Sequence, residues 1–181
     1  MTLIEAIQAN DEKVFFELLN SPLPANPLEK KIIDEVDLQL RGSPLYWAVT
    51  LGHTHFIASL VRAGVDINKA NKVGTTPVFA AACNDQASVI AELHALGANV
   101  GMPNSNGATP VFVAAQKGHA SAIAALHALG ANVNMPQNEG ITPIYVAVQN
   151  GNIEAISALL EAGANVSTRT PQGTPLELAK R

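Results

Sequence analysis

Residues 107–136 read GATPVFVAAQKGHASAIAALHALGANVNMP, and a close copy of this stretch lies on each side of it. The preceding copy, at residues 74–103, is GTTPVFAAACNDQASVIAELHALGANVGMP, and the following one, at residues 140–169, is GITPIYVAVQNGNIEAISALLEAGANVSTR. A hydroxyl residue followed by proline recurs at Pro44, Pro77, Pro110, Pro143 and Pro175, in steps of 33, 33, 33 and 32 residues. Self-similarity at such a period indicates a repeat architecture, in which stacked units share a continuous core.

Each part of the repeat predicts a local structure. Threonine before proline predicts a helix start, because the hydroxyl accepts a hydrogen bond from a free N–H and proline tolerates the first helical position. Gly118 is expected to end this first helix, since glycine adopts the left-handed conformation at little cost. A second helix carries Ile123 and Leu126, whose i, i+3 spacing places both on one buried face, and Gly130 ends it. Helices this short are marginal alone, so each unit must pack on its neighbours.

The pattern G-x-T-P-(apolar)-x-x-A-A-x-x-G-H, with two short helices and then G-A-N-V, resembles the ankyrin repeat. The resemblance covers residues 41–181 closely. Residues 1–20 resemble a degenerate first unit, with Leu3, Ala6 and Asn10-Asp11 at the apolar, alanine and Gly-His positions, followed by Val14 and Leu18-Leu19. The resemblance implies an all-α, ankyrin-type helical repeat solenoid with turn-like or hairpin-like loops between units.

The alignment predicts seven segments along the chain. These are a degenerate N-terminal capping repeat at 1–20, an inserted proline-rich loop and short helix at 21–40, full repeats at 41–73, 74–106, 107–139 and 140–172, and a C-terminal half repeat at 173–181. Within the insertion, Asn26-Pro27 is expected to cap a short helix through about Asp34, and Glu29–Asp37 is interpreted as a solvated helix face rather than a docking site. The half repeat is either a trimmed cap or the cut end of a longer protein.

Two departures from the family pattern affect the packing. The histidine usual after T-P-(apolar) is replaced by an aromatic side chain, so we expect aromatic packing in place of a hydrogen-bond ladder; the residues are Tyr46, Phe79, Phe112 and Tyr145. The third unit has Asp85-Gln86 where Gly-His is expected, and aspartate tolerates a left-handed turn better than most residues do.

Composition restricts the class of partner. The formal net charge is −4, only 14% of the 181 residues are charged, and just three charged side chains lie between Val73 and Asn138. We therefore expect no binding to nucleic acid and no membrane insertion, and a partner bound by shape, apolar contact and amide hydrogen bonds with weak salt dependence. The single cysteine, Cys83, excludes an internal disulfide and fits a reducing compartment. A cytoplasmic protein without a signal peptide is the expectation.

The cysteine and the five histidines are the candidates for catalysis or metal binding. No local catalytic signature or glycine-rich phosphate loop accompanies them, so we predict no catalytic residue, no cofactor and no enzyme activity. His94 and His127 share one repeat position, but two histidines make a poor zinc site, and we expect partly packed rings and no metal. For His53 and His119, at the Gly-His position, the resemblance implies a structural hydrogen bond.

In ankyrin-like proteins the usual partner contacts lie on turn tips and on the exposed face of the first helices. By alignment, the resemblance assigns these contacts to Trp47, Thr50, Leu51, Lys72, Val73, Cys83, Asn84, Asn106, Val113, Gln116, Lys117, Glu139, Ile141, Val146, Gln149 and Asn150. Trp47 has two interpretations, an interface hot spot or a cap residue that shields the core, because large aromatic side chains serve both roles.

The predicted function is a non-catalytic protein–protein interaction module that holds a protein partner in the concave groove. The alternative is that the chain is the targeting module of a larger enzyme or effector whose catalytic part is absent. A monomer is expected, and self-association through the C-terminal end, where Leu159 and Leu160 are expected to have little cover, is a further hypothesis. The repeats are also similar in style to ankyrin proteins of intracellular bacteria, some of which are delivered into a host cytosol, which suggests a bacterial effector.

Overall fold

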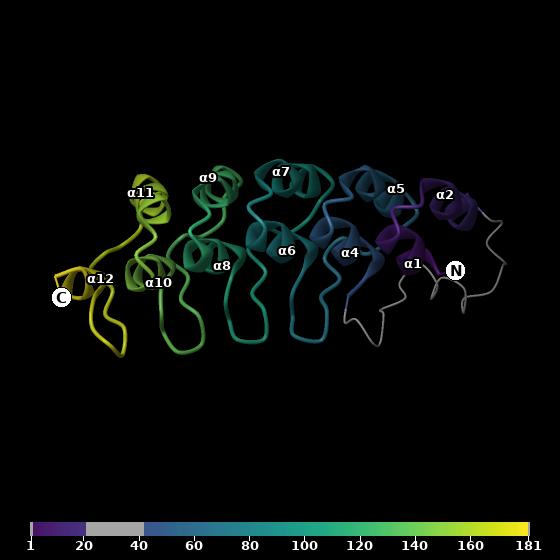
Figure 1. The fold of residues 1–181 in the computed structure, drawn as a ribbon. Coiled ribbons are helices and arrows are strands. Elements are labelled where there is room, and N and C mark those ends of the chain that lie inside the picture. Colours follow the sequence, from purple (N-terminus) through teal and green to yellow (C-terminus); the bar gives the residue numbers. More distant parts are fainter. Residues whose placement is uncertain (1, 21–41, 181) are drawn as a thin grey trace. The chain divides into compact units, whose positions relative to one another are not determined.

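The computed structural model describes residues 2–20 and 42–180, so the predictions for residues 21–40, including the charged helix and the Glu29–Asp37 face, lie outside the described residues. The described residues form helices and turns (Figure 1). The only extended pairing among them is an isolated antiparallel bridge between Thr170 and Gly173. The all-α prediction is therefore confirmed for this part of the chain. The chain divides into an N-terminal unit, residues 1–77, and a C-terminal unit, residues 78–181.

The N-terminal unit contains α1 (Leu3–Gln8), α2 (Glu12–Asn20), α4 (Pro44–Thr50), the 3₁₀ turn η1 (Thr54–Phe56) and α5 (Ile57–Arg62). Helix α1 packs against α2 and α4, and α4 packs against α5. The rings of Phe15 and Phe56 are fully buried, with their centroids 4.1 Å apart. Phe15 thus takes the core position that follows Asn10-Asp11, while Val14 is only half-buried.

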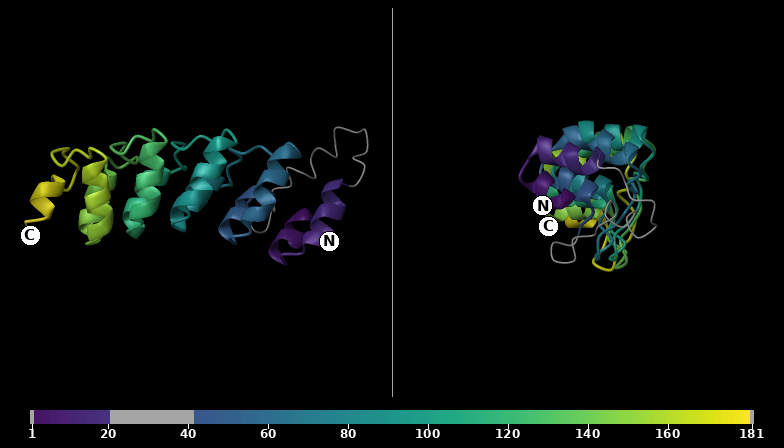
Figure 2. Two further views of the ribbon diagram at one scale, coloured as in Figure 1. Left: turned by 90° about the horizontal axis from the view of Figure 1, so that it is seen from above. Right: turned by 90° about the vertical axis from the view of Figure 1, so that its right-hand side faces the viewer.

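The C-terminal unit contains α6 (Pro77–Cys83, starting at the boundary), α7 (Ala87–Ala95), α8 (Pro110–Lys117), α9 (Ala120–Ala128), α10 (Pro143–Gln149), α11 (Ile153–Glu161) and α12 (Pro175–Leu178). The first helices α8 and α10 pack together, and so do the second helices α7, α9 and α11 (Figure 1). Seen from above, these second helices lie side by side and nearly parallel (Figure 2). Long loops join each second helix to the next first helix and extend beyond the row of first helices.

Helix starts follow the capping that the sequence predicts. The hydroxyls of Ser43, Thr109 and Thr142 accept hydrogen bonds from the N–H three residues later, at 3.2, 3.2 and 3.4 Å. Thr174 does the same at 3.1 Å, and Glu177 returns a bond to the Thr174 N–H to complete a capping box. Proline follows each of these caps at the start of the helix. These observations confirm the predicted helix starts.

The second helices contribute paired isoleucine and leucine side chains to the core of the C-terminal unit. The isoleucine–leucine pairs Ile90/Leu93 of α7 and Ile123/Leu126 of α9 are fully buried. Burying one such side chain contributes about 1.5–3 kcal/mol relative to leaving it in water. The i, i+3 prediction is therefore confirmed for these two helices, and their burial fixes the second helices against one another.

The prediction for the end of α11 is partly wrong. Leu159 is fully buried, because it occupies the same core position as the leucines of the preceding second helices. Leu160 is 50% exposed and Ile153 is 65% exposed. Self-association through this end stays a prediction, which sedimentation at several protein concentrations tests.

Side-chain hydrogen bonds tie neighbouring repeats of the C-terminal unit together. His119 Nε2 lies 3.1 Å from the Cys83 carbonyl oxygen, which confirms the structural hydrogen bond implied for this histidine. Asn152 takes the same position one repeat later, and its Nδ2 donates to the carbonyl oxygens of Ala115 and Gln116, both at 2.9 Å. The carboxyl ends of α6 and α8 are thereby held by the turn of the following repeat.

Asp85 has a structural role at the position where the third unit departs from the family pattern. Its φ is +52°, in the same left-handed region as the +84° of Gly118 one repeat later. Its Oδ1 accepts a hydrogen bond of 2.9 Å from the backbone N–H of Ala122, the third residue of α9. Aspartate at this position therefore caps a helix of the next repeat, which glycine cannot do.

Candidate functional site

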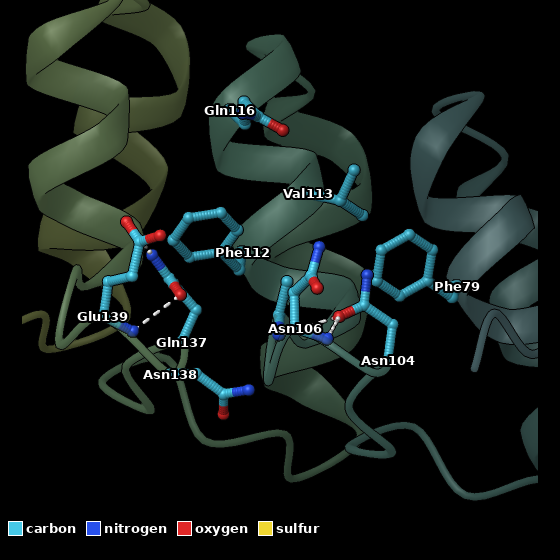
Figure 3. Close-up of a pocket in the computed structure, with 10 residues that line it drawn as sticks. Phe79, Asn104, Asn106, Phe112, Val113, Gln116, Gln137, Asn138 and Glu139 are labelled. Atoms are coloured by element: carbon cyan, nitrogen blue, oxygen red, sulfur yellow. Dashed lines mark hydrogen bonds between the residues drawn. The ribbon is translucent and has the colours of Figure 1, made fainter. Parts of the chain in front are cut away.

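A cleft of about 390 Å³ opens in the C-terminal unit beside the first helix α8 (Figure 3). It lies between two consecutive inter-repeat loops, and its lining residues are Phe79, Asn104, Asn106, Ala108, Phe112, Val113, Gln116, Gln137, Asn138 and Glu139. The cleft therefore combines a first-helix surface with the tips of two loops.

The base of the cleft is apolar. Phe79 comes from α6, while Phe112 and Val113 come from the first two turns of α8 (Figure 3). Their side chains are 6%, 8% and 6% exposed. Phe79 and Phe112 occupy the position at which the family pattern usually has histidine, so the replacement by aromatic side chains gives the cleft its apolar base.

The two loops are shaped by hydrogen bonds from their own side chains. Asn104 Oδ1 accepts bonds from the backbone N–H groups of Asn106 and Ala108, at 2.9 and 3.0 Å. Gln137 Oε1 accepts a bond of 2.8 Å from the Glu139 N–H in the next loop. A side-chain amide that bonds to nearby backbone groups in this way fixes a turn without a regular strand.

Neighbouring loops are also bonded to each other. The backbone N–H of Asn138 donates to the Asn106 carbonyl oxygen at 3.0 Å, and Asn138 Nδ2 donates to the Ser105 carbonyl oxygen at 3.3 Å. Gly107, with φ of +75°, allows this close approach because a Cβ there would clash with Asn138. The two walls of the cleft are thus held in a fixed register.

Several polar groups of the cleft are unused within the described residues. The side-chain amides of Asn106 and Gln116 are exposed and make no hydrogen bond there. Among the described residues, Glu139 is the one charged residue in the lining, and its Oε2 accepts only a long bond of 3.4 Å from Gln137 Nε2. Amide groups above an apolar base, with a carboxylate at one side, can bind a polar chain that also carries apolar surface.

Four of the predicted contact residues meet in this cleft: Asn106, Val113, Gln116 and Glu139. Five more lie at the carboxyl ends of α6, α8 and α10 or directly after them: Cys83, Asn84, Lys117, Gln149 and Asn150. All of these five except Cys83 are exposed, although Asn150 Nδ2 already donates to the Gln116 carbonyl oxygen at 2.9 Å. Their role as contacts remains a prediction.

The expectation of exposed contact side chains at Ile141 and Val146 is wrong. They are only 8% and 5% exposed, so neither offers a partner much surface. An alignment gives a residue's position in the repeat, but it does not show which neighbouring atoms bury that residue. A branched apolar side chain is more stable when buried than in water. Val113, at the position equivalent to Val146, is also buried but borders the cleft.

The remaining predicted contacts, Trp47, Thr50, Leu51, Lys72 and Val73, lie in the N-terminal unit. Leu51 and Val73 are 41% and 48% exposed and Lys72 is exposed, whereas the Thr50 hydroxyl donates to the Tyr46 carbonyl oxygen at 2.8 Å. The Trp47 ring is half-buried edge-on against Tyr46, and its Nε1 is buried with no hydrogen-bond partner in the described residues. Both interpretations of Trp47 stay predictions.

Six lining residues were not among the predicted contacts: Phe79, Asn104, Ala108, Phe112, Gln137 and Asn138. A sequence signal existed for Asn104 and Gln137, because each lies two residues before a predicted contact, Asn106 or Glu139, and they are one repeat apart. The aromatic substitutions at Phe79 and Phe112 were a second signal, since they break the family pattern in adjacent units.

Cys83 and the two histidines His94 and His127 lie in different environments. Burial raises the pKa of the Cys83 thiol above its usual value, and the Lys117 ammonium lowers it in part, so the thiol is the dominant form at neutral pH. His94 and His127 are exposed near the ends of α7 and α9. Within residues 2–20 and 42–180, no cluster of three or more potential metal ligands occurs, and no helix is long and apolar enough to cross a membrane.

Comparison with known proteins identifies the repeat. A search of curated proteins gives no match to the chain. A family model described as ankyrin repeats (3 copies) matches residues 3–104 and again residues 79–170. Ankyrin repeats form a non-catalytic fold that generally mediates protein–protein interaction. Because these matches span most of its length, the chain belongs to the ankyrin repeat family.

Proposed function

We propose that this chain is a non-catalytic module that binds a protein partner along the first helices and loop tips of its C-terminal unit, with the cleft beside α8 as the centre of the contact. The cleft supports this proposal most directly. The side-chain amides of Asn106 and Gln116, which make no hydrogen bond within the described residues, lie over an apolar base formed by Phe79 and Phe112. Such a surface suits a partner whose backbone amides can bond to the side-chain amides of the cleft while its side chains pack on the apolar base.

The scarcity of charge favours the same mode of binding. In the described part of the chain, Glu139 is the one charged residue that lines the cleft, and Lys117 is the one charged side chain on α8. Electrostatic steering of a partner over long distance is therefore weak, and the association rate is expected to change little between low and physiological salt. The apolar contacts and amide hydrogen bonds carry the affinity instead.

The experiment compares the wild-type chain with a groove variant and an outer-face control. The groove variant carries Asn84→Ala, Gln116→Ala and Gln149→Ala, three exposed residues at the carboxyl ends of α6, α8 and α10. The control carries Ser88→Ala, Ser121→Ala and Ser157→Ala, three exposed residues of the second helices α7, α9 and α11. Proteins that the wild-type chain captures from the cytosol in which it normally acts are expected to be lost with the groove variant and retained with the control. The opposite pattern would refute the proposed face.

We also propose that the protein acts as a bacterial effector in the cytoplasm of a host cell. The support is the similarity in style between its repeats, such as LHALGANV at residues 93–100 and 126–133, and those of ankyrin proteins from intracellular bacteria. Fusion to a reporter enzyme that is active only in host cytosol tests this role during infection. Absence of the reporter signal from infected cells, although the bacterium makes the fusion protein, would reject it.

A further inference from the structure

We propose that the cleft beside α8 receives the guanidinium group of an arginine side chain from an extended segment of the partner. This inference rests on the proposed function, because it names the chemistry that the same cleft recognises. It follows from the charge of the lining, the aromatic base, the free amides and the size of the cleft.

The charge of the cleft favours a cation. Among the described residues that line the cleft, Glu139 is the one charged side chain, and none of them is lysine, arginine or histidine. The only side-chain bond that its carboxylate accepts in the described residues is the 3.4 Å contact from Gln137 Nε2, so a stronger donor can replace or join that contact. A cation is therefore favoured in the cleft and an anion is disfavoured. Because Glu139 is exposed, this ion pair is weak by itself and needs further contacts.

The aromatic base of the cleft also suits a long cationic side chain. Phe79 and Phe112 border the cleft from adjacent first helices, and each keeps a small exposed fraction there. An aromatic ring attracts a cation placed over its face, and the methylene stem of a long cationic side chain packs well on apolar surface. The base therefore suits a side chain that is apolar along its length and charged at its tip.

The positions of the hydrogen-bond acceptors in the cleft favour arginine over lysine. The amides of Asn106 and Gln116 stand on the loop wall and on α8, and each has a free carbonyl oxygen within the described residues (Figure 3). Together with the Glu139 carboxylate they offer acceptors on several sides of the cleft. A planar guanidinium has five donors that can reach such separated acceptors at once, whereas a lysine ammonium is a compact charge with three donors.

The size of the cleft suits a single side chain of an extended segment. A volume of about 390 Å³ is at the small end of the range for ligand pockets, which is roughly 300–1,000 Å³. This space accommodates one long side chain with part of its backbone rather than a folded surface. Asn104 Oδ1 is occupied by two backbone N–H groups, so its Nδ2 is left as a donor for a backbone carbonyl of the bound segment.

A peptide titration followed by NMR tests the inference. The probe is the capped tripeptide acetyl-Gly-Arg-Gly-amide, compared with the same peptide containing citrulline, which is neutral and nearly isosteric, or lysine. The arginine peptide is expected to shift the signals of Glu139 and of the Asn106 and Gln116 side-chain amides in a saturable way, with a millimolar dissociation constant as suits so small a ligand. Binding is expected to weaken about fivefold or more for citrulline and severalfold for lysine.

Matched variants complete the test. Glu139→Gln removes the charge and keeps the shape, and it is expected to weaken arginine binding about fivefold. Glu154→Gln removes the same charge from an exposed position of α11 and is expected to leave binding unchanged. The amide spectrum of each variant establishes that it is folded.

Three results would overturn the inference: no saturable shift at the cleft, equal binding of the citrulline peptide, or equal binding of the lysine peptide. These failures are separable from a failure of the proposed function. If the groove variant still loses its captured proteins while the arginine peptide fails to bind, protein binding stands and only the arginine assignment falls.

Discussion

Replacement of Asp85 tests how the departure from the family pattern stabilises the C-terminal unit. The Asp85 carboxylate accepts a hydrogen bond of 2.9 Å from the N–H of Ala122 in the first turn of α9. Loss of a helix cap costs about 1 kcal/mol, and loss of a negative charge near a helix N-terminus costs roughly a further 0.5 kcal/mol. Asp85→Ala loses both and keeps the left-handed backbone at φ of +52°, which alanine adopts poorly, so we expect a total loss of about 2 kcal/mol.

Asp85→Gly separates the two effects. Glycine loses the same hydrogen bond and charge, but it adopts the left-handed conformation about 1 kcal/mol more favourably than alanine does, so the expected net loss is about 1 kcal/mol. For a chain of this size these values lower the melting temperature by about 6 °C for the alanine variant and about 3 °C for the glycine variant. Asn84→Ala, at the neighbouring exposed residue, is the control and is expected to change stability by less than about 0.5 kcal/mol.

The assay is thermal unfolding followed by circular dichroism, with hydrogen exchange of the Ala122 amide as a local probe. This amide is expected to exchange faster in both Asp85 variants, since it loses its acceptor. The reasoning is refuted if the alanine variant is as stable as the wild type, or if the glycine variant loses as much stability as the alanine variant.

Two further predictions concern the cleft and the cysteine. Gly107→Ala places a Cβ 2.8 Å from the Asn138 backbone nitrogen at φ of +75°, whereas the Cβ of Gly130→Ala, at φ of +86°, meets nothing within 4 Å. In urea unfolding, the free energy of unfolding should therefore fall by at least about 1 kcal/mol more for Gly107→Ala than for Gly130→Ala. Equal losses of stability would contradict the contact between the loops. Alkylation of Cys83 by iodoacetamide should be slower at pH 8 than that of a free cysteine peptide and should rise with pH, because burial raises the pKa of the thiol. Lys117→Met should slow the alkylation further, since it removes the ammonium that stabilises the thiolate, and a faster reaction would show that this charge effect has the wrong sign.

The parts of the fold that depend on local sequence could be predicted. The start of α8 follows from Thr109-Pro110, because the cap and the proline act within one helical turn. Burial of Ile123 and Leu126 follows from their spacing on a helix and from the repetition of that spacing in neighbouring units. The period of 33 residues then indicates that the units pack on one another.

The cleft depends on distances between residues of neighbouring repeats, and the repeat pattern in the sequence does not give these distances. The repeat pattern predicts only packing for Phe112, but its ring borders a cleft that Asn104 and Gln137 of two consecutive loops also line. The burial of Val146 has the same origin, since exposure is set by what covers a position and not by its place in the repeat. The bond from Asp85 to Ala122 joins residues 37 apart and becomes visible only when the two repeats are packed.

The central claim is that a protein partner contacts the first helices and loop tips of the C-terminal unit, and site-specific photo-crosslinking tests it most directly. Benzoylphenylalanine replaces either Gln116, which lines the cleft, or Ser121, which is exposed on the second helix α9. After irradiation in native cytosol, a discrete crosslinked protein is expected from position 116 and none from position 121. A crosslink from position 121 alone, or of equal yield from both positions, would contradict the claim.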